Sequence, residues 1–526
     1  MAKVITADQA AELIKDGSTV AWTSAGMCGF AEEVMIAIEQ RFLKTGCPRQ
    51  ITAAHTAGCG DLKTKGMNHL AHEGLIKRLI CGHTGHAPLM GQLILDNKVE
   101  AYTLPQGVLA QLWREIAGKK PGVITKVGLK TYVDPRLEGG KISPRTKEDL
   151  VKVIDLEGEE WLLYKAFPVN VAVIRGTAAD ENGNLTMDKE ALFLEALPMA
   201  QAAKNSGGIV IAQVEYVVKS ETLHPQRVKV PGVLVDYVVV AKPENHMQTA
   251  STLFNPALCG DIRIPLGNIR ALPLNDRKII ARRAAMELVP NSIINLGIGI
   301  PDGIGSVAAE EGVLDMLTFT MELGTYGGVP EFPAALNADA IIQHEAQFDF
   351  YDGGGLDATF LGLAQTDKEG NLNVSKFGPK VVGPGGFINI AQNAKEVVFC
   401  GALIAGAETE ISDGKLHIKK EGKTKKFVEK VSQITFSGRY AQEQKQPVLY
   451  VTERAVFTLE EGQITLIEIA PGVDLEKDVL AAMEFRPRIS KDLKEMPSDL
   501  FQPVWGKLRQ IMESKAKQRA QAATTH

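Results

Sequence analysis

The chain has 526 residues, of which 45% are hydrophobic and 23% are charged, and its formal net charge is -5. This length exceeds what one hydrophobic core usually supports, so it predicts two or more α/β-sized domains of an ordinary soluble protein. The negative charge offers no general attraction to nucleic acid, and the longest apolar runs are too short to span a bilayer. We therefore expect neither a nucleic-acid partner nor a membrane segment.

The N-terminal residues 1–17 are predicted to form an amphipathic helix led in by Asp8. This segment lacks the apolar core and the small-residue cleavage site of a signal peptide. The six cysteines are irregularly spaced and contain no C-x-x-C pair, which suits a reducing compartment and argues against a disulfide framework. These features predict a cytoplasmic protein.

Farther along the chain, short β-branched runs alternate with segments of helical periodicity. Residues 208–218 and 292–300 are typical of buried strands, whereas residues 31–43 and 277–289 follow a helical pattern. This alternation indicates largely parallel sheets flanked by helices. The expected fold class is α/β, built from open α/β/α domains.

Histidines and cysteines gather in the first part of the chain, where "CGHTGH" supplies Cys81, His83 and His86 after His55 and Cys59. A metal site is the alternative that this crowding raises. The spacing matches neither the Cys pairs nor the His pairs that usually bind zinc. We therefore predict no metal.

An internal repeat links the two parts of the chain. The segment "RGTAADENGNLTMDKEA" (Arg175–Ala191) resembles "GLAQTDKEGNLNVSKFG" (Gly362–Gly378), and a Gly-rich turn precedes each copy. The repeat predicts a duplicated unit, with an insertion in the first half that includes residues 126–150. Breaks in regular pattern across residues 243–275 predict a linker. We place the boundary near Leu274, giving domains 1–274 and 275–526.

The second half opens with a glycine turn, "NLGIGIPDG", after a strand-like run. Gly297, Gly299 and Gly303 do not have the G-x-G-x-x-G spacing of dinucleotide-binding turns, and Pro301 interrupts the pattern. The turn could present backbone amides to a phosphate or an oxyanion. A tight turn without a ligand explains the spacing equally well.

The stretch "MELGTYGGVP" places Glu322 at the end of a predicted strand, residues 317–321, and before three glycines. The carboxyl ends of strands in open α/β sheets line the ligand crevice. Glu322 could cap a helix or pair with a distant arginine, or it could attack an activated acyl group as a covalent nucleophile. The residues alone leave both readings open.

Two further segments could supply hydrogen-bond donors. Gly385 and Gly386 precede a helical pattern and are candidates for backbone donors to a thioester oxygen, and Gln106 in "YTLPQGVLA" could supply a side-chain donor. Near the C-terminus, residues 413–431 predict lysine-bearing hairpins exposed to solvent, and residues 513–526 predict a frayed polar tail.

Together these segments resemble the class I coenzyme A transferases of the fused, single-chain type, of the propionate and acetate CoA-transferase kind. The resemblance covers nearly the whole chain and rests on the following motifs: "GFAEEV", "YTLPQGVLAQLWREIAGKKPGVITKVGL", "VDPR", "IRGTAADENGNLT", "VPGVLVDYVVVA", "NLGIGIP", "FDFYDGGGLD", "GNLNVSKFG", "GGFINI", "ITFSG", "YVTERAVF" and "EIAPGVDLEKDVL". It implies two similar α/β domains, which correspond to separate subunits in other members, and a homodimer or homotetramer.

The resemblance also implies roles for particular residues. Glu322 would attack an acyl-CoA and carry CoA as a glutamyl thioester in a ping-pong exchange with a short-chain carboxylate. CoA would be a substrate, with no permanently bound cofactor. The implied oxyanion and acyl pocket comprises Gln106, Gly385, Gly386 and Gly26, and the implied CoA-binding residues are Gly297, Gly299, Pro301 and Lys376.

Three residues depart from the family pattern beside the glutamate. Met321 stands where a Val is usual, Leu323 where a small residue is usual, and Tyr326 where an Ile is frequent. Their bulk could change the preferred chain length of the acyl group. Two other functions stay open at this stage: hydrolysis of acyl-CoA, with water as the acceptor, and non-catalytic sensing of acyl-CoA or another metabolite.

Overall fold

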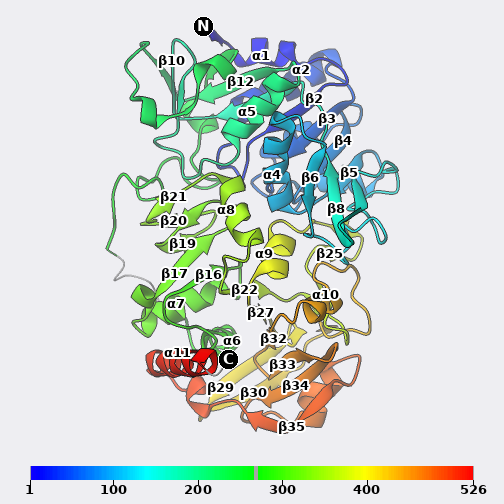
Figure 1. The fold of residues 1–526 in the computed structure, drawn as a ribbon, viewed down its shortest axis with the longest axis vertical. Coiled ribbons are helices and arrows are strands. Elements are labelled where there is room, and N and C mark those ends of the chain that lie inside the picture. The colour runs from blue at the N-terminus through cyan, green and yellow to red at the C-terminus, as the bar shows by residue number, and fades with distance from the viewer. Residues whose placement is uncertain (1, 266–270, 525–526) are drawn as a thin grey trace.

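A computed structural model describes residues 2–265 and 271–524. Figure 1 shows two halves stacked along the long axis of the molecule, with the N-terminal half at one end and the C-terminal half at the other. Each half is built around one large sheet, and the two sheets share no strand among the described residues. We call residues 2–265 the first half and residues 271–524 the second half.

The sheet of the first half has eight strands, all parallel. Helices cover both faces, so successive residues of a central strand enter different cores: Val20 and Trp22 face one cluster and Ala21 the other. In spatial order the strands are β1 (Lys3–Ile5), β15 (Tyr237–Val240), β12 (Ile209–Val214), β9 (Val171–Arg175), β2 (Thr19–Trp22), β3 (Ile51–His55), β4 (Ile76–Cys81) and β5 (Glu100–Thr103). The helices are α1 (Ala7–Leu13), α2 (Glu32–Thr45), α3 (Pro88–Leu95), α4 (Gln106–Ala117) and α5 (Ala196–Asn205).

The sheet of the second half has ten strands, and its five central strands, β17 to β32, are parallel. In spatial order the strands are β21 (Ala340–Ile341), β18 (Thr325–Tyr326), β17 (Leu317–Met321), β16 (Ser292–Leu296), β22 (Ala358–Gly362), β27 (Val397–Cys400), β32 (Val448–Val451), β33 (Ala455–Glu460), β34 (Gln463–Ile469) and β35 (Arg488–Glu495). The helices are α6 (Asp276–Ala285), α7 (Asp302–Glu310), α8 (His344–Asp352), α9 (Phe387–Asn393), α10 (Gly438–Glu443) and α11 (Leu508–Thr524). The predicted α/β class with largely parallel sheets is confirmed.

The internal repeat has a structural counterpart. The order β15-β12-β9-β2-β3 in the first sheet corresponds to β32-β27-β22-β16-β17 in the second, with every pair parallel. The repeated acidic turns also match, because Asp180 accepts a hydrogen bond from the backbone of Asn184 at 2.9 Å and Asp367 from that of Asn371 at 3.1 Å. The position after β3 is Thr56, whose hydroxyl accepts from Trp113 at 2.8 Å, and the corresponding position after β17 is Glu322.

The first half is longer between β3 and β9, which are the second and third of its repeated strands in chain order. The extra residues form β4, β5 and a three-stranded antiparallel sheet of β6 (Gly122–Thr125), β8 (Glu159–Lys165) and β7 (Val151–Leu156). Residues 126–150 connect β6 to β7 in a series of turns. The boundary near Leu274 stays a prediction. It falls just before α6, where the Asn275 side chain accepts from the backbone of Lys278 at 3.1 Å.

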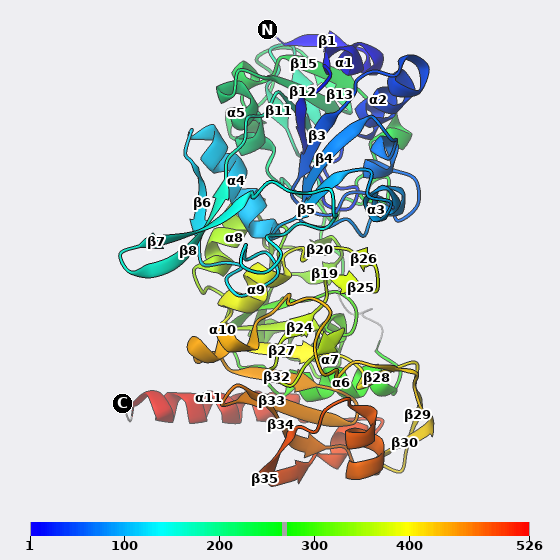
Figure 2. The same ribbon diagram turned by 90° about the vertical axis from the view of Figure 1, so that its right-hand side faces the viewer.

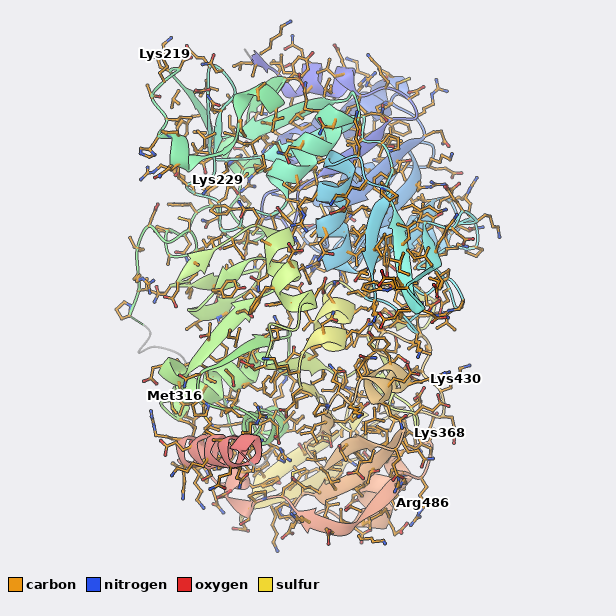
Figure 3. All side chains as sticks on the ribbon, in the orientation of Figure 1. Lys219, Lys229, Met316, Lys368, Lys430 and Arg486 are labelled. Carbon is orange, nitrogen blue, oxygen red and sulfur yellow. The ribbon has the colours of Figure 1, made fainter. Side chains whose placement is uncertain are left out.

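Both halves also contain smaller sheets. The first half carries β13 (Tyr216–Val218), β10 (Ala178–Asp180), β11 (Leu185–Thr186) and β14 (Val228–Val230) as a four-stranded sheet. The second half has two-stranded pairs: β19 (Val329–Glu331) with β20 (Ala334–Leu336), β23 (Gln365–Thr366) with β24 (Leu372–Asn373), β25 (Lys376–Phe377) with β26 (Lys380–Val381), β28 (Ile404–Ala405) with β31 (Thr424–Lys425), and β29 (Glu408–Ser412) with β30 (Lys415–Lys420). The last pair is one of the expected lysine-bearing hairpins, and Figure 3 shows Lys368, Lys430 and Arg486 along the outer edge of this half.

Both ends of the chain differ from the sequence prediction. Residues 3–5 form an edge strand paired with β15 rather than the start of a helix, and Thr6, not Asp8, caps α1. Residues 513–524, predicted to fray, continue α11, which is visible in red in Figures 1 and 2. Ion pairs from Lys515 to Glu287 and from Arg519 to Glu396 hold this helix against the second half. Across residues 2–265 and 271–524, no helix combines the length and apolarity that crossing a membrane requires.

Candidate active site

Glu322 lies directly after β17, at the carboxyl end of a parallel strand. Phe319 and Met321 of that strand are buried, and the chain then reverses into β18, which pairs antiparallel with β17. Gly324 makes the reversal possible: its φ is +110°, and a Cβ there would lie 2.3 Å from the carbonyl oxygen of Ile342. The sequence prediction that Glu322 ends this strand is confirmed.

Gln106 reaches Glu322 from the first half. It is the first residue of α4, it is 2% exposed, and its backbone N–H donates to the carbonyl of Gly385 at 2.9 Å. Its side-chain Nε2 donates to Oε1 of Glu322, also at 2.9 Å. The two residues predicted separately as a donor and a nucleophile are therefore in direct contact.

The glycine pair before α9 lies against the same carboxylate. A Cβ on Gly386 would stand 2.0 Å from Oε2 of Glu322, so only a glycine leaves room for this side chain. The N–H of Gly385 donates to the carbonyl of Gly82 at 2.9 Å. Of the two predicted backbone donors, Gly385 is thus already occupied by a structural hydrogen bond.

Glu322 faces a cavity of about 370 Å³ that both halves line. Six of the residues predicted from the sequence contribute to its wall: Gly26, Gln106, Gly297, Glu322, Gly385 and Gly386. Apolar neighbours include Leu296, Leu361 and Phe387. A volume of this size falls within the range of small-molecule sites.

Among the described residues that line the cavity, the other three predicted site residues are absent. Gly299 is exposed, with a φ of +100°, and its N–H donates to the side chain of Asp302 at 2.8 Å. Pro301 precedes α7, and Lys376 lies on the hairpin of β25 and β26. The structure therefore brings Gly297 to Glu322 but leaves the rest of the proposed CoA-binding set outside.

The surroundings of Glu322 stabilise its ionised form only weakly. Burial raises the pKa of Glu322 above its ordinary value, and the hydrogen bond from Gln106 acts in the opposite direction. A carboxylate without strong charge pairing keeps more of its nucleophilicity once it is ionised. The geometry is suited to attack on an acyl group rather than to a structural ion pair.

Sequence reasoning missed two residues behind Gln106. Nε2 of His344 lies 3.2 Å from Nε2 of Gln106, and Nδ1 of His344 contacts Oε1 of Glu195. Both His344 and Glu195 are fully buried. They are 149 residues apart in the chain, and no motif links them, so only a family alignment or a contact prediction could have paired them.

Two of the histidines considered as metal ligands, His83 and His86, line this cavity, with ring centroids 5.3 Å apart. Burial, together with the nearby His86 and Lys380, lowers the pKa of His83 to about 3. Cys81 is buried at the end of β4. In the part of the chain that the structure describes, no group of three or more His, Cys, Asp or Glu side chains is arranged to hold a metal ion.

The three residues that depart from the family pattern have different surroundings. Met321 and Leu323 line the cavity, and Leu323 is packed in a cluster that includes Ala25 and Ala57 of the first half. Tyr326 instead packs against Phe350, with ring centroids 6.0 Å apart. Only Met321 and Leu323 therefore touch the space that a substrate would enter.

Comparison with known sequences identifies a family. A family model described as Coenzyme A transferase matches residues 4–241. The chain is 52% identical over 522 residues to the caffeate CoA-transferase of Acetobacterium woodii, covering 97% of this chain and 100% of that protein. It is 45% identical over 505 residues to the acetate CoA-transferase YdiF of Escherichia coli K12, covering 95% of each.

Solved structures lead to the same conclusion. The apoenzyme of the acyl-CoA transferase YdiF from Escherichia coli O157:H7 superposes with a TM-score of 0.92 at 44% identity, over 96% of this chain and 97% of that one. The same protein in a thioester complex with CoA gives a TM-score of 0.91 at 43% identity, over the same shares of the two chains. The chain therefore belongs to the coenzyme A transferase family. It is an enzyme that transfers CoA, and CoA thioesters are its substrates.

The contact between Gly386 and Glu322 yields a test. We expect Gly386→Ala to lower CoA-transferase activity by about 100-fold or more, because the new methyl group must displace the carboxylate from its place beside Gln106. Gly362→Ala is the matched control, since Gly362 lines the same cavity and a Cβ there meets nothing within 4 Å. Steady-state rates and circular dichroism of both variants make the comparison. Equal activity of the two variants would show that this contact is unimportant.

Proposed function

We propose that this enzyme transfers CoA from a short-chain acyl-CoA to a carboxylate acceptor by a ping-pong mechanism, with Glu322 as the covalent nucleophile. One observation carries the proposal: the Glu322 carboxylate projects into a cavity and is held by the Gln106 amide at 2.9 Å rather than by a cation. The similarity to an acetate CoA-transferase, and to a protein solved as a CoA thioester complex, supports the same chemistry.

The first half-reaction has two acyl-transfer steps. A carboxylate oxygen of Glu322 attacks the thioester carbonyl, the C–S bond breaks, and the products are an acyl-glutamyl anhydride and CoA thiolate. The thiolate then attacks the glutamyl carbonyl, which releases the acyl group as a free carboxylate and leaves Glu322 joined to CoA through a thioester. No proton and no redox partner are consumed.

The second half-reaction reverses these steps with a different carboxylate. The acceptor attacks the glutamyl thioester, and the thiolate that leaves then attacks the acyl carbonyl of the new anhydride to give the new acyl-CoA. Each step passes through an oxyanion, and the N–H groups of the Gln106 amide and of Gly386 are our candidates to stabilise it. The Gly385 amide is excluded from this role by its bond to Gly82.

The remaining assignments complete the proposal. CoA enters along the turn from Gly297 to Pro301, and Lys376 is a candidate for binding its phosphates.

The chain acts as a homodimer or homotetramer of two-domain subunits, with domains at residues 1–274 and 275–526. Its six cysteines are free in the structure, which suits a reducing compartment such as the cytoplasm.

A covalent label tests the nucleophile. We expect incubation with acetyl-CoA followed by borohydride to reduce Glu322 to an alcohol, and hydroxylamine to convert it to a hydroxamate, because both reagents attack the glutamyl thioester. Mass spectrometry of the peptide that contains residue 322 detects either change. Glu322→Gln should lose the label and lower the rate by at least about 10⁴-fold.

Protein treated with either reagent without prior incubation with acetyl-CoA is the control for this experiment, since its peptide must remain unmodified. Glu322→Asp separates transfer from hydrolysis: a shortened carboxylate that releases free CoA without an acceptor would mark water as a competing acceptor. Full exchange between labelled acetate and acetyl-CoA in Glu322→Gln would contradict the proposal that Glu322 is the nucleophile.

The raised pKa of Glu322 predicts the pH dependence of the reaction. Only the ionised carboxylate attacks, and because burial raises its pKa, ionisation is lost at a higher pH than for an ordinary glutamate. We expect kcat/KM for acyl-CoA to fall on acidification with a midpoint above about 4.3, the value for an exposed Glu. Glu345, with its pKa raised by burial to about 7, is the nearby acid to control for. The fall should persist in Glu345→Gln, and a midpoint at or below 4.3 contradicts the assignment.

The cavity wall predicts which departure from the family pattern controls specificity. Leu323→Ala should shift preference toward longer carboxylates, because it enlarges the space beside Glu322. Tyr326→Phe should leave the preference unchanged, since Tyr326 packs on Phe350 outside the cavity. Rates for a series of C2 to C6 carboxylates measure both effects. A shift in the Tyr326 variant alone would reverse our assignment.

A further inference from the structure

A chain of four polar side chains, the first three of them buried, ends at the half-buried Glu322. It begins at Glu195, passes through His344 and Gln106, and alternates between the first and second halves of the molecule at each link. Glu195 and His344 are fully buried, and Gln106 is 2% exposed. The mechanism proposed above uses only the last two members of this chain.

The fold fixes the first two members firmly. Glu195 immediately precedes α5, and His344 is the first residue of α8. The backbone N–H of His344 donates to the carbonyl of Leu194 at 3.3 Å, so the two helix starts are also joined through the main chain. The imidazole packs on Phe348, with ring centroids 5.2 Å apart. His344 has little freedom to turn away from Gln106.

The direction of the hydrogen bonds follows from the chemistry of the end group. A carboxylate oxygen accepts hydrogen bonds, so the contact with Glu195 places the imidazole hydrogen on Nδ1 of His344. Nε2 of His344 then carries a lone pair and accepts from Gln106 at 3.2 Å. The amide nitrogen of Gln106 has two hydrogens, and it gives one to His344 and the other to Glu322.

Two contacts disfavour the opposite orientation of the Gln106 amide. A flipped Gln106 would direct its carbonyl oxygen at the lone pair of His344, which is fully buried, and also at the carboxylate of Glu322. A Gln amide has no intrinsic preference between its two ends, so its environment must supply one. In this chain the environment is the pair of Glu195 and His344.

We propose that His344, oriented by Glu195, is a positioning residue that holds the Gln106 amide with its NH₂ group toward Glu322. The inference rests on the function proposed above, in which the Gln106 amide stabilises the oxyanion formed on the glutamyl carbonyl. His344 touches neither substrate nor reacting atoms, and it acts through Gln106 alone. Its contribution must therefore disappear when the amide is removed.

A double-mutant cycle tests this dependence. His344→Leu should slow formation of the Glu322–CoA thioester about 10- to 100-fold, less than complete loss of an oxyanion donor, with little change in KM for acyl-CoA. His344→Gln, which keeps an acceptor near the position of Nε2, should lose only about threefold. In a Gln106→Leu background, His344→Leu should change the rate by less than about twofold. Single-turnover mass spectrometry of the labelled peptide follows the slow variants.

Each alternative result has a defined meaning. Equal losses from His344→Leu with and without the Gln106 amide would show a structural role and overturn the inference, as would an unchanged rate in the single variant. If His344→Leu fails to fold, His344→Gln decides: a loss as large as about 100-fold with normal folding also overturns it. Absence of the thioester label in the unmodified enzyme would instead refute the function proposed for Glu322, so the two failures are distinguishable.

Discussion

The placement of one carboxylate between two halves of the chain is the constraint on which the rest of the site depends. Glu322 is supplied by the second half, its donor Gln106 by the first, and the glycine that makes room for it by the turn before α9. A carboxylate that is partly withdrawn from water is costly unless it is hydrogen-bonded, and it loses nucleophilicity if it is paired too strongly. The single amide contact is a compromise between these demands, and it holds only while the halves stay in register.

That register is set where α4 packs against α8 in the middle of the molecule (Figure 1). A Cβ on Gly107 would lie 2.4 Å from the ring of Phe348, so a glycine at this point of α4 lets the helices approach closely. Farther along the same contact, Arg114 pairs with Asp349 at 2.7 Å. The start of α4 carries Gln106 and the start of α8 carries His344, so the helix contact that joins the halves also aligns the polar groups behind Glu322.

Local sequence patterns predicted the parts of this protein that depend on neighbouring residues. The strand before Glu322, the glycines after it and the repeated acidic turns all have short-range signals. The pairing of His344 with Glu195 has none, because it is created by the docking of two helix starts. Likewise, sequence could nominate both Gly385 and Gly386 as donors, but it could not show that Gly82 already accepts from Gly385. The helical end of the chain was missed because its ion-pair partners, Glu287 and Glu396, are distant in sequence.

The duplicated fold bears on the number of catalytic centres in each chain. Two related sheets offer two equivalent strand ends, yet the first ends at Thr56, whose hydroxyl is occupied by the buried indole of Trp113. Threonine lacks the carboxylate that the proposed exchange requires, so this strand end supplies no second centre of that kind. Under the mechanism that we propose, titration should therefore count one equivalent of bound CoA for each 56.9 kDa chain, whatever the number of chains in the assembly.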